Sequence, residues 1–526
     1  MYSTRSNKTL ANKRNILIIL LILIISLLLF LMLPRVFKKT KSVVNSNRLN
    51  FDSSVSQQEQ EQITKAISDK NITLSDNTTV SVKTVTSVED TNSVLSAYVL
   101  ATGLYASRQS INNNKLATLE VKVSQEVDET IIPKLAEVLG ISTNKIEKQT
   151  SNLDASSKEI IILPAKELNA KQKLLMYNDS YYLDKFNSGA IFRVASFSNT
   201  GSEKLREVKL NDLPNQQNIA KINQTGVTAL TRLMMRKLNE VKDPLYFSKY
   251  IGPVLKDADL THISNEVSFK QGCTYHDAVF CSDPRFIETI KDSGVDLVEL
   301  TGNHNNDAGR QYNADTINLY KQLGIATFGG GLNTEEAKKF YTADIKGNKV
   351  AFLGYNHADS PSGGPIASST EAGANSFDYS KIKNDIQAAK QQAQFVIVDV
   401  QFAECYSYPD GYVEYPICNL PINGQQETFR KISDLGADMV IGSQAHQSQI
   451  YEQYQDKMIY YGLGNLYFDQ TQWPGTERGI ILTHYFKDGK LLQTKLTPTI
   501  YDAAFQTKPM ADQQATKFLD FLNNSR

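Results

Sequence analysis

Short apolar runs alternate with amphipathic segments through the second half of the chain, from residue 222 onward. Aliphatic and β-branched runs predict buried strands, and apolar positions three and four residues apart predict helices between them. We expect strands at 225–230, 260–267, 296–301, 349–355, 395–402 and 438–442, and helices at 231–241, 284–293, 312–323, 379–391 and 425–435. This alternation predicts a largely parallel α/β sheet. Later strand-like runs at 458–463, 480–486 and 491–500 extend it with antiparallel strands.

The preceding module, residues 61–215, mixes the two kinds of pattern less regularly. Strand-like runs occur at 80–85, 119–127, 159–163 and 190–197, and helical spacing at 93–108 and 133–139. The mixture predicts a smaller α/β or α+β domain. Because the module contains neither His nor Cys, we expect it to bind a ligand or to act as a spacer rather than to catalyse a reaction.

The longest apolar run, at 15–33, carries no charge and matches the thickness of a bilayer's hydrocarbon core. No small-residue cleavage site follows it. We therefore expect a cytoplasmic tail at 1–14, an uncleaved single-pass anchor at 15–33 and a polar linker at 34–60. A cleaved secretion signal is the lesser alternative. Basic residues flank the run on both sides, so the positive-inside rule does not decide its orientation.

Four cysteines bear on the orientation instead. They form two local pairs, Cys273 with Cys281 and Cys405 with Cys418. Two short-loop disulfides fit this spacing and would place the C-terminal bulk of a cell-membrane protein outside the cytoplasm. Four separate thiols in a reducing compartment are the alternative.

Polar residues collect where the predicted strands end. They are Asn265 and Glu266, Asn303 and His304 with Asp307, Gln401 with Glu404, Gln444 with His446, and Asn465. Because the carboxyl ends of parallel strands share one edge of a sheet, these groups predict a single crevice. Carboxylate, amide and imidazole groups suit a divalent metal and proton transfer. Each group taken alone could also be a capped turn.

Several separated motifs in this module follow a familiar order and spacing. They are Asp257-Ala258-Asp259-Leu260 with Asn265-Glu266, Gly302-Asn303-His304 with Asp307, Gly329-Gly330-Gly331-Leu332-Asn333, Val350-Ala351-Phe352-Leu353-Gly354-Tyr355, Leu435-Gly436-Ala437-Asp438 with Gly442 and His446, and Leu463-Gly464-Asn465. Together they resemble the capsule-synthesis protein CapA family of the calcineurin-like metallophosphoesterases. The resemblance implies a four-layer α/β/β/α metallophosphoesterase-like domain at 222–505, followed by a C-terminal helix within 506–526. It also implies a cell-envelope location, a link to poly-γ-glutamate or a similar capsule polymer, and a membrane synthase as partner.

Three positions depart from the family's pattern. Gly226-Val227 stands where the family has Gly-Asp, Gln401-Phe402-Ala403 where it has His-Trp-Gly, and Gln444-Ala445-His446 where it has His-Pro-His. The resemblance leaves Glu266, Asn303 and His446 as ligands of at most one weakly held divalent ion, such as Mn, Fe or Zn, or of none. His304, with Asp307, is expected to serve as the catalytic acid.

These observations favour a membrane-anchored protein that acts in the synthesis or export of an anionic envelope polymer. Two alternatives stay open: a non-catalytic polymer-binding protein with a degenerate metal site, and a metal-dependent phosphoesterase. Tyr406, Tyr408 and Tyr412, with Trp473, are candidates to line a groove for an extended polymer or to pack their own loop. The chain has 56 basic and 56 acidic residues, so it lacks the excess of positive charge that would indicate a nucleic-acid partner.

Overall fold

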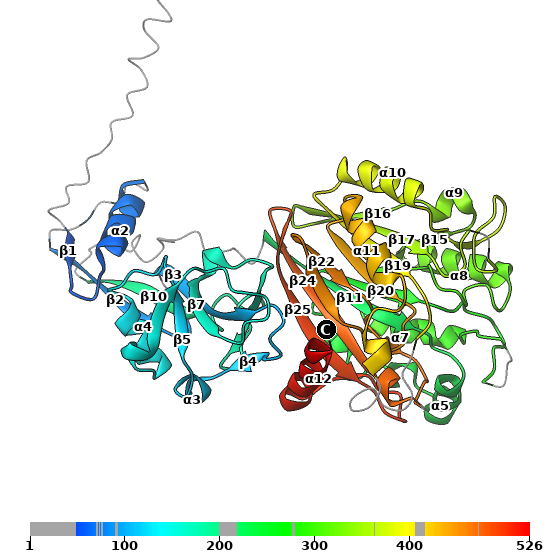
Figure 1. Cartoon of the computed structure of the whole chain (residues 1–526), viewed down its shortest axis with the longest axis horizontal. Helices are drawn as coiled ribbons and strands as arrows, with labels where there is room; N and C mark the ends of the chain where they lie inside the picture. The colour runs from blue at the N-terminus through cyan, green and yellow to red at the C-terminus, as the bar shows by residue number, and fades with distance from the viewer. Residues whose placement is uncertain are drawn as a thin grey trace, which may run out of the picture.

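The computed structural model describes residues 49–69, 72, 74, 77–89, 93–198, 218–275, 279–361, 363–405, 416–471 and 473–525. The predicted tail and the apolar run at 15–33 lie outside these ranges, as do His276, Tyr406, Tyr408 and Tyr412. Within them, no helix combines the length and the apolar character that crossing a bilayer requires. The described chain forms two modules that lie side by side (Figure 1).

The N-terminal module is built on one mixed sheet with the strand order β1-β2-β10-β3-β7-β5-β6, and β8 pairs with β3. Its main elements are β1 (Leu49–Phe51), α2 (Gln57–Asp69), β2 (Thr78–Val85), β3 (Ser93–Gly103), β5 (Val121–Ser124), α4 (Ile132–Leu139), β6 (Ile146–Gln149), β7 (Ile160–Pro164), β8 (Gln172–Leu174) and β10 (Ile191–Ser198). Helices α2 and α4 cover one face of the sheet, where Ile63 and Leu135 are buried. The other face packs toward the second module.

Two predictions for this module are wrong. Residues 93–108 do not form a helix, because their first eleven residues form strand β3. This strand lies in the middle of the sheet and is buried on both faces, so it shows none of the polar alternation that marks a half-buried strand. The predicted linker also ends too late. Strand β1 and the start of α2 already lie within 49–60, and Ser56 and Glu59 form a reciprocal capping box at the start of α2.

The C-terminal module contains two larger sheets. The first has the order β14-β13-β12-β11-β24-β25-β26, with β23 beside β11, and the second has the order β16-β17-β19-β20-β22-β21. The first is made of β11 (Ile219–Thr228), β12 (Leu260–Asn265), β13 (Leu297–Glu299), β14 (Ala326–Phe328), β23 (Asn465–Tyr467), β24 (Arg478–Lys487), β25 (Lys490–Ile500) and β26 (Lys508–Pro509). The second is made of β16 (Tyr341–Ile345), β17 (Asn348–Asn356), β19 (Phe395–Gln401), β20 (Met439–Ser443), β21 (Tyr451–Tyr454) and β22 (Lys457–Tyr460).

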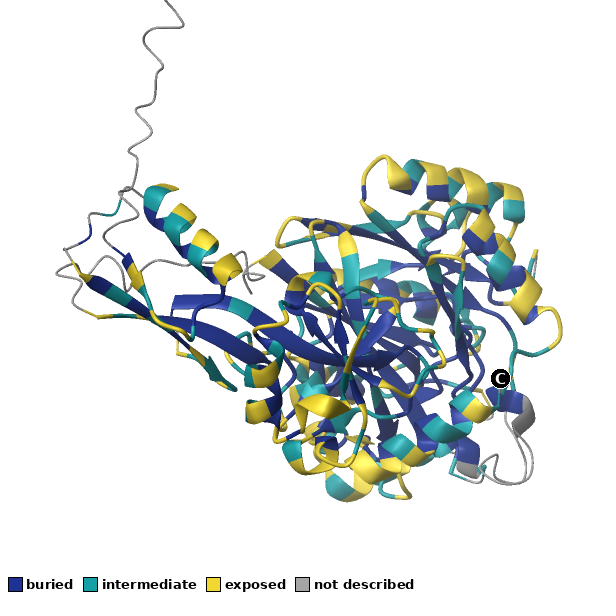
Figure 2. Cartoon of the chain, turned by 60° about the vertical axis from the view of Figure 1, so that its left-hand side comes forward, coloured by how far each residue is buried: buried dark blue, intermediate teal, exposed yellow. Residues whose placement is uncertain are grey.

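Helices cover the outer faces of both sheets and complete four layers. Residues such as Ile222, Phe352 and Ile397 fill the core between the sheets. Helices α5 (Leu233–Val241), α7 (Ile287–Asp292) and α8 (Arg310–Gln322) pack on the first sheet, and α10 (Tyr379–Lys390) and α11 (Gln425–Asp434) pack on the second. The closing helix α12 (Asp512–Asn524) buries one apolar face against the core between the sheets. Burial follows this layering, with dark strands inside and exposed outer helix faces (Figure 2).

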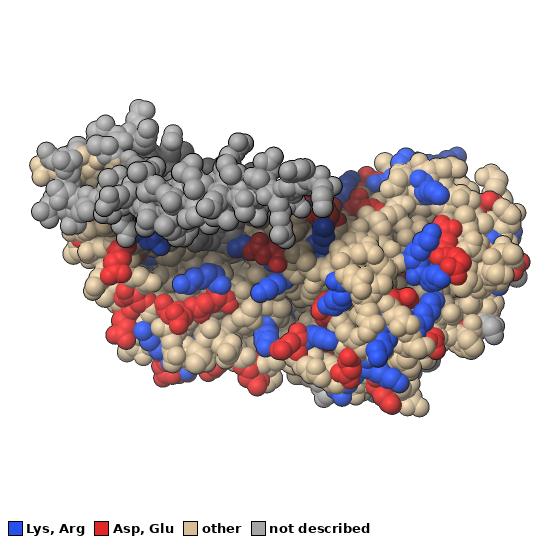
Figure 3. All heavy atoms as spheres, turned by 90° about the horizontal axis from the view of Figure 1, so that it is seen from above, with Lys and Arg blue, Asp and Glu red and all other residues tan. Residues whose placement is uncertain are grey.

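The order of strands and helices predicted for this module is confirmed, with ends shifted by a few residues, but the strands divide between two sheets, and the run predicted as antiparallel at 458–463 forms β22, which is parallel to β20. Strands β11 to β14 run parallel, as do β17, β19, β20 and β22, whereas β24 and β25 are antiparallel. Both predicted cysteine pairs are bonded, Cys273 to Cys281 and Cys405 to Cys418. Acidic and basic side chains mix on the face seen in Figure 3, where the described residues show no broad patch of one sign.

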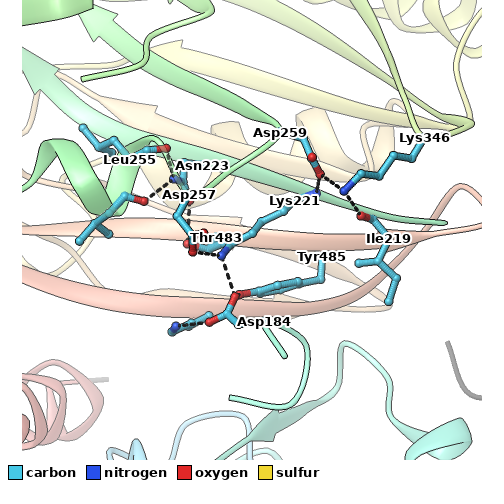
Figure 4. A network of polar contacts seen from close by, with 12 residues as sticks. Asp184, Ile219, Lys221, Asn223, Leu255, Asp257, Asp259, Lys346, Thr483 and Tyr485 are labelled. Carbon is cyan, nitrogen blue, oxygen red and sulfur yellow. Dashed lines mark hydrogen bonds and ion pairs between the residues drawn. The ribbon is translucent and has the colours of Figure 1, made fainter. Parts of the chain in front are cut away.

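A partly buried ionic network joins the two modules (Figure 4). The carboxylate of Asp184 accepts hydrogen bonds from Lys221 (2.6 Å), Lys495 (2.9 Å) and the Tyr485 hydroxyl (2.6 Å). Burial raises the pKa of Asp184, but the charges of Lys495 and Lys221 outweigh it and lower the pKa overall. Because Lys221 lies near the start of β11, the N-terminal module packs at the edge opposite the ends of the parallel strands.

Candidate functional site

The predicted polar groups meet at the carboxyl ends of the parallel strands. The backbone N–H of Glu266, just past β12, donates to the carbonyl of Thr228 at the end of β11 (3.0 Å), and His304 pairs with Val267 as an isolated bridge. Gly226 is required in β11 because a Cβ there would lie 1.9 Å from the Gly464 carbonyl oxygen. The glycine of the family's Gly-Asp motif is therefore needed for packing, even though Val227 replaces the acid.

Neutral amides link the ends of the parallel strands. Gln401 Nε2, at the end of β19, donates to Asn303 Oδ1 (3.0 Å) and also to Gln444 Oε1. Asn356, at the end of β17, donates to Gln401 Oε1 (2.8 Å). The Asn303 oxygen that a metal would need therefore already accepts a hydrogen bond from Gln401. Gln444 lies at the turn after β20, where its φ is 81°.

His304 lies on one side of the crevice. Its Nδ1 pairs with Asp307 Oδ2 (2.8 Å), and its ring lies 4.3 Å from the ring of Phe280, measured between centroids. Burial lowers the pKa of His304, but the Asp307 hydrogen bond and the charge of Glu266 outweigh it, so the pKa is raised overall. The imidazole therefore holds its proton more firmly than an ordinary histidine, as a proton donor requires.

His446 lies on the other side and is fully buried. Its Nδ1 contacts Asn465 Oδ1 (3.0 Å), its Nε2 lies 3.6 Å from Glu404 Oε1, and its ring stacks on Phe468 at 5.0 Å. Burial lowers the pKa of His446, but the charge of Glu266 and the Glu404 contact raise it more. The Glu404 pKa is lowered, chiefly by its hydrogen bond to His446.

The charge of Glu266 acts on both histidines and raises the pKa of each. Its side chain is 2% exposed, and neither carboxylate oxygen has a hydrogen-bond partner in the described part of the chain. An unpaired buried carboxylate is costly unless nearby positive charge compensates it. When protonated, His304 and His446 carry positive charge that compensates it. Asn265, by contrast, turns toward its own loop, where Nδ2 donates to the Val267 carbonyl (2.8 Å).

These side chains do not fit the metal centre that the resemblance implies. Among the described residues, no group of three or more His, Cys, Asp or Glu side chains could hold a metal ion. Of the expected ligands, Asn303 bonds to Gln401 and His446 contacts Asn465 and Glu404, which leaves Glu266. A pair of divalent ions needs several anionic ligands in place, and the described donors do not supply them.

Three charged residues near the crevice were not predicted from the sequence. Arg232, before α5, forms a two-bond ion pair with Asp469, which is 3% exposed. Deeper in, Glu299 on β13 and Asp399 on β19 are buried, and burial followed by Glu299's charge raises the pKa of Asp399 well above its usual range. For Arg232, the sequence offered one signal, which is that a charged residue follows shortly after a predicted strand. The two acids look like ordinary strand residues in the sequence.

The second module is similar to known capsule proteins. The family profile described as bacterial capsule synthesis protein PGA_cap matches residues 221–470. The capsule biosynthesis protein CapA of Bacillus anthracis is 25% identical over 253 residues, covering 46% of this chain and 58% of that protein. The PGA biosynthesis protein CapA of Bacillus subtilis is 24% identical over 269 residues, covering 50% and 67%. This chain thus matches less than two thirds of the B. anthracis protein.

Similarity to solved structures is weak. The calcineurin-like phosphoesterase YfkN of Bacillus subtilis aligns with 57% of this chain and 99% of that chain, at 11% identity and a TM-score of 0.30. A putative 5'-nucleotidase of Staphylococcus aureus aligns with 57% and 58%, at 14% identity and a TM-score of 0.33. The sequence matches, together with the motifs at the strand ends, show that the second module resembles the CapA family of bacterial capsule synthesis proteins, as a divergent relative.

Proposed function

We propose that this protein acts in the synthesis or export of an anionic envelope polymer of the poly-γ-glutamate type, and that its crevice contacts the polymer through protein side chains. The relation to CapA proteins, one of them described as a PGA biosynthesis protein, supports the polymer class. The apolar run at 15–33 and the two disulfides support a membrane-anchored protein whose C-terminal bulk lies outside the cytoplasm.

The amide network of Asn303, Gln401 and Gln444 is the observation that carries this proposal. It occupies strand ends where the family resemblance leads us to expect metal ligands. Gln401 and Gln444 are buried and hold Asn303, which is only partly buried, and an amide at that position can donate to and accept from a polymer that repeats amide links and carboxylates. Within this proposal the crevice binds and orients the polymer, and His304 holds a proton near it.

Deleting the gene in the organism that carries it is expected to lower cell-associated polymer at least about tenfold, and the intact gene should restore it. A Gln401→Ala and Gln444→Ala double variant should fail to restore it, because it removes side-chain hydrogen bonds worth about 1 kcal/mol each and leaves Asn303 without its Gln401 donor. The matched control is Gln391→Ala with Gln392→Ala, two exposed glutamines at the end of α10. γ-Linked glutamate in hydrolysed cell envelopes is the measured quantity. Unchanged polymer after deletion contradicts the proposed function.

A further inference from the structure

Arg232 has a backbone conformation that side-chain-bearing residues rarely adopt. It lies four residues past the end of β11 and directly before α5, with φ of 47° and ψ of −110°. Such a conformation costs free energy and persists only where the surroundings hold it, and strained residues of this kind cluster at functional sites.

Four contacts hold the Arg232 side chain in place. Asp469 accepts from Arg232 Nε (3.2 Å) and from Nη2, and it also accepts from the backbone N–H of Leu233 (2.9 Å). The guanidinium carbon lies 4.3 Å from the ring centre of Phe280 and 5.1 Å from that of Phe468. The guanidinium is therefore held along one edge by a buried acid and packed against two aromatic rings.

This position lies beside both site histidines. The same two rings contact the site histidines, because Phe280 lies against His304 and Phe468 stacks on His446. The charge of Arg232 also contributes to lowering the pKa of Glu404, after the larger effect of His446. The Arg232 side chain is 31% exposed, and its Nη1 has no hydrogen-bond partner among the residues that the structure describes.

We propose that Arg232 is the specificity-determining residue that recognises a carboxylate of the polymer, donating from Nη1 to that group. This inference rests on the proposed function. Arginine presents its donors in a planar fork that matches carboxylate geometry, and the Asp469 pair fixes the orientation of that fork before the polymer arrives. Glu404 carries a negative charge close enough to Arg232 to interact with it. Selection therefore depends on directed hydrogen bonds rather than on a general attraction for anions.

The test compares two probes, a γ-linked glutamate hexamer and the same hexamer with each free α-carboxylate converted to an uncharged carboxamide. Their binding to the full-length chain in detergent is measured by calorimetry at physiological salt. The wild-type protein should bind the acid at least about tenfold more tightly than the amide. Arg232→Gln should lose this preference while its affinity for the amide changes less than about twofold. Arg236→Gln is the matched control, because Arg236 lies in α5 and is 53% exposed.

Arg232→Gly separates recognition from a purely structural role. Glycine adopts positive φ without strain, and adding Asp469→Asn removes the buried carboxylate that would otherwise lose its arginine, so the double variant should stay folded and still lose the preference for the acid. If Arg232→Gln keeps the wild-type ratio of acid to amide affinity, Arg232 is not the recognition residue, and the proposed function stands. If the wild-type protein binds neither probe, the proposed function is wrong and this inference is wrong with it.

Discussion

Replacing Asp399 by asparagine is expected to stabilise the protein increasingly as pH rises above about 4, and to change its stability little below that pH. Asp399 is buried in β19, and its Oδ2 has no hydrogen-bond partner in the described part of the chain. Burial, followed by the charge of Glu299, raises its pKa well above the usual range. Asparagine has nearly the same shape and cannot ionise.

The sign of this effect follows from proton binding. Above the ordinary aspartate pKa near 4, the unfolded chain has released the proton that the folded protein still holds. The folded state then binds more protons than the unfolded state, so stability falls as pH rises through that window. The asparagine variant should lack this fall in stability, which amounts to at most about 1.4 kcal/mol for each pH unit.

Urea unfolding at several pH values, followed by the fluorescence of Trp473, the single tryptophan, measures the difference. Asp344→Asn is the control, because Asp344 is an exposed acid on β16 of the same sheet, where substitutions change stability by less than about 0.5 kcal/mol. Parallel curves of stability against pH for wild type and Asp399→Asn would show that Asp399 ionises normally in the folded protein.

Arg193→Met is expected to destabilise the N-terminal module by about 3–5 kcal/mol. The Arg193 and Glu59 side chains are 1% and 4% exposed and form two bonds, Nε to Oε1 (2.8 Å) and Nη2 to Oε2 (2.9 Å). Arg193 also donates to Thr84 Oγ1 (2.9 Å) and to the Ser54 carbonyl (2.7 Å). Methionine would fill much of the space but would leave the Glu59 carboxylate buried without its arginine.

Hydrogen exchange of the amides in α2 and β10 reports on this module separately from the rest of the chain. A second substitution, Glu59→Met, made together with Arg193→Met, should recover most of the lost protection, because it removes the unpaired charge. Slow exchange in the single variant, equal to that of wild type, would mean that the ion pair contributes little to the stability of the module.

Much of the C-terminal module could be predicted from the sequence, because its parallel strands are short apolar runs with amphipathic helices between them. Such strands end at one edge, so the polar residues after them were expected to meet. Asn303 with Gln401, and His446 with Asn465, are contacts of this kind between residues far apart in the chain. The cysteine pairs could be predicted because each pair closes a short loop.

Other features depend on three-dimensional contacts that leave no local pattern. Strand β3 is buried on both faces, so its composition resembles that of a helix as much as that of a strand. The role of Arg232 depends on Asp469, which lies 237 residues further along the chain. Asp399 has the pattern of a strand residue, and only the neighbouring sheet places Glu299 close enough for its charge to act on it.

The most direct test of this account is the affinity of the full-length protein for poly-γ-glutamate, measured before and after treatment with a chelator. If the crevice contacts the polymer through its own side chains, the two affinities should agree within about twofold, and added Mn, Fe or Zn should change neither. If chelation abolishes binding and one of these metals restores it, a metal ion holds the polymer and the account is wrong.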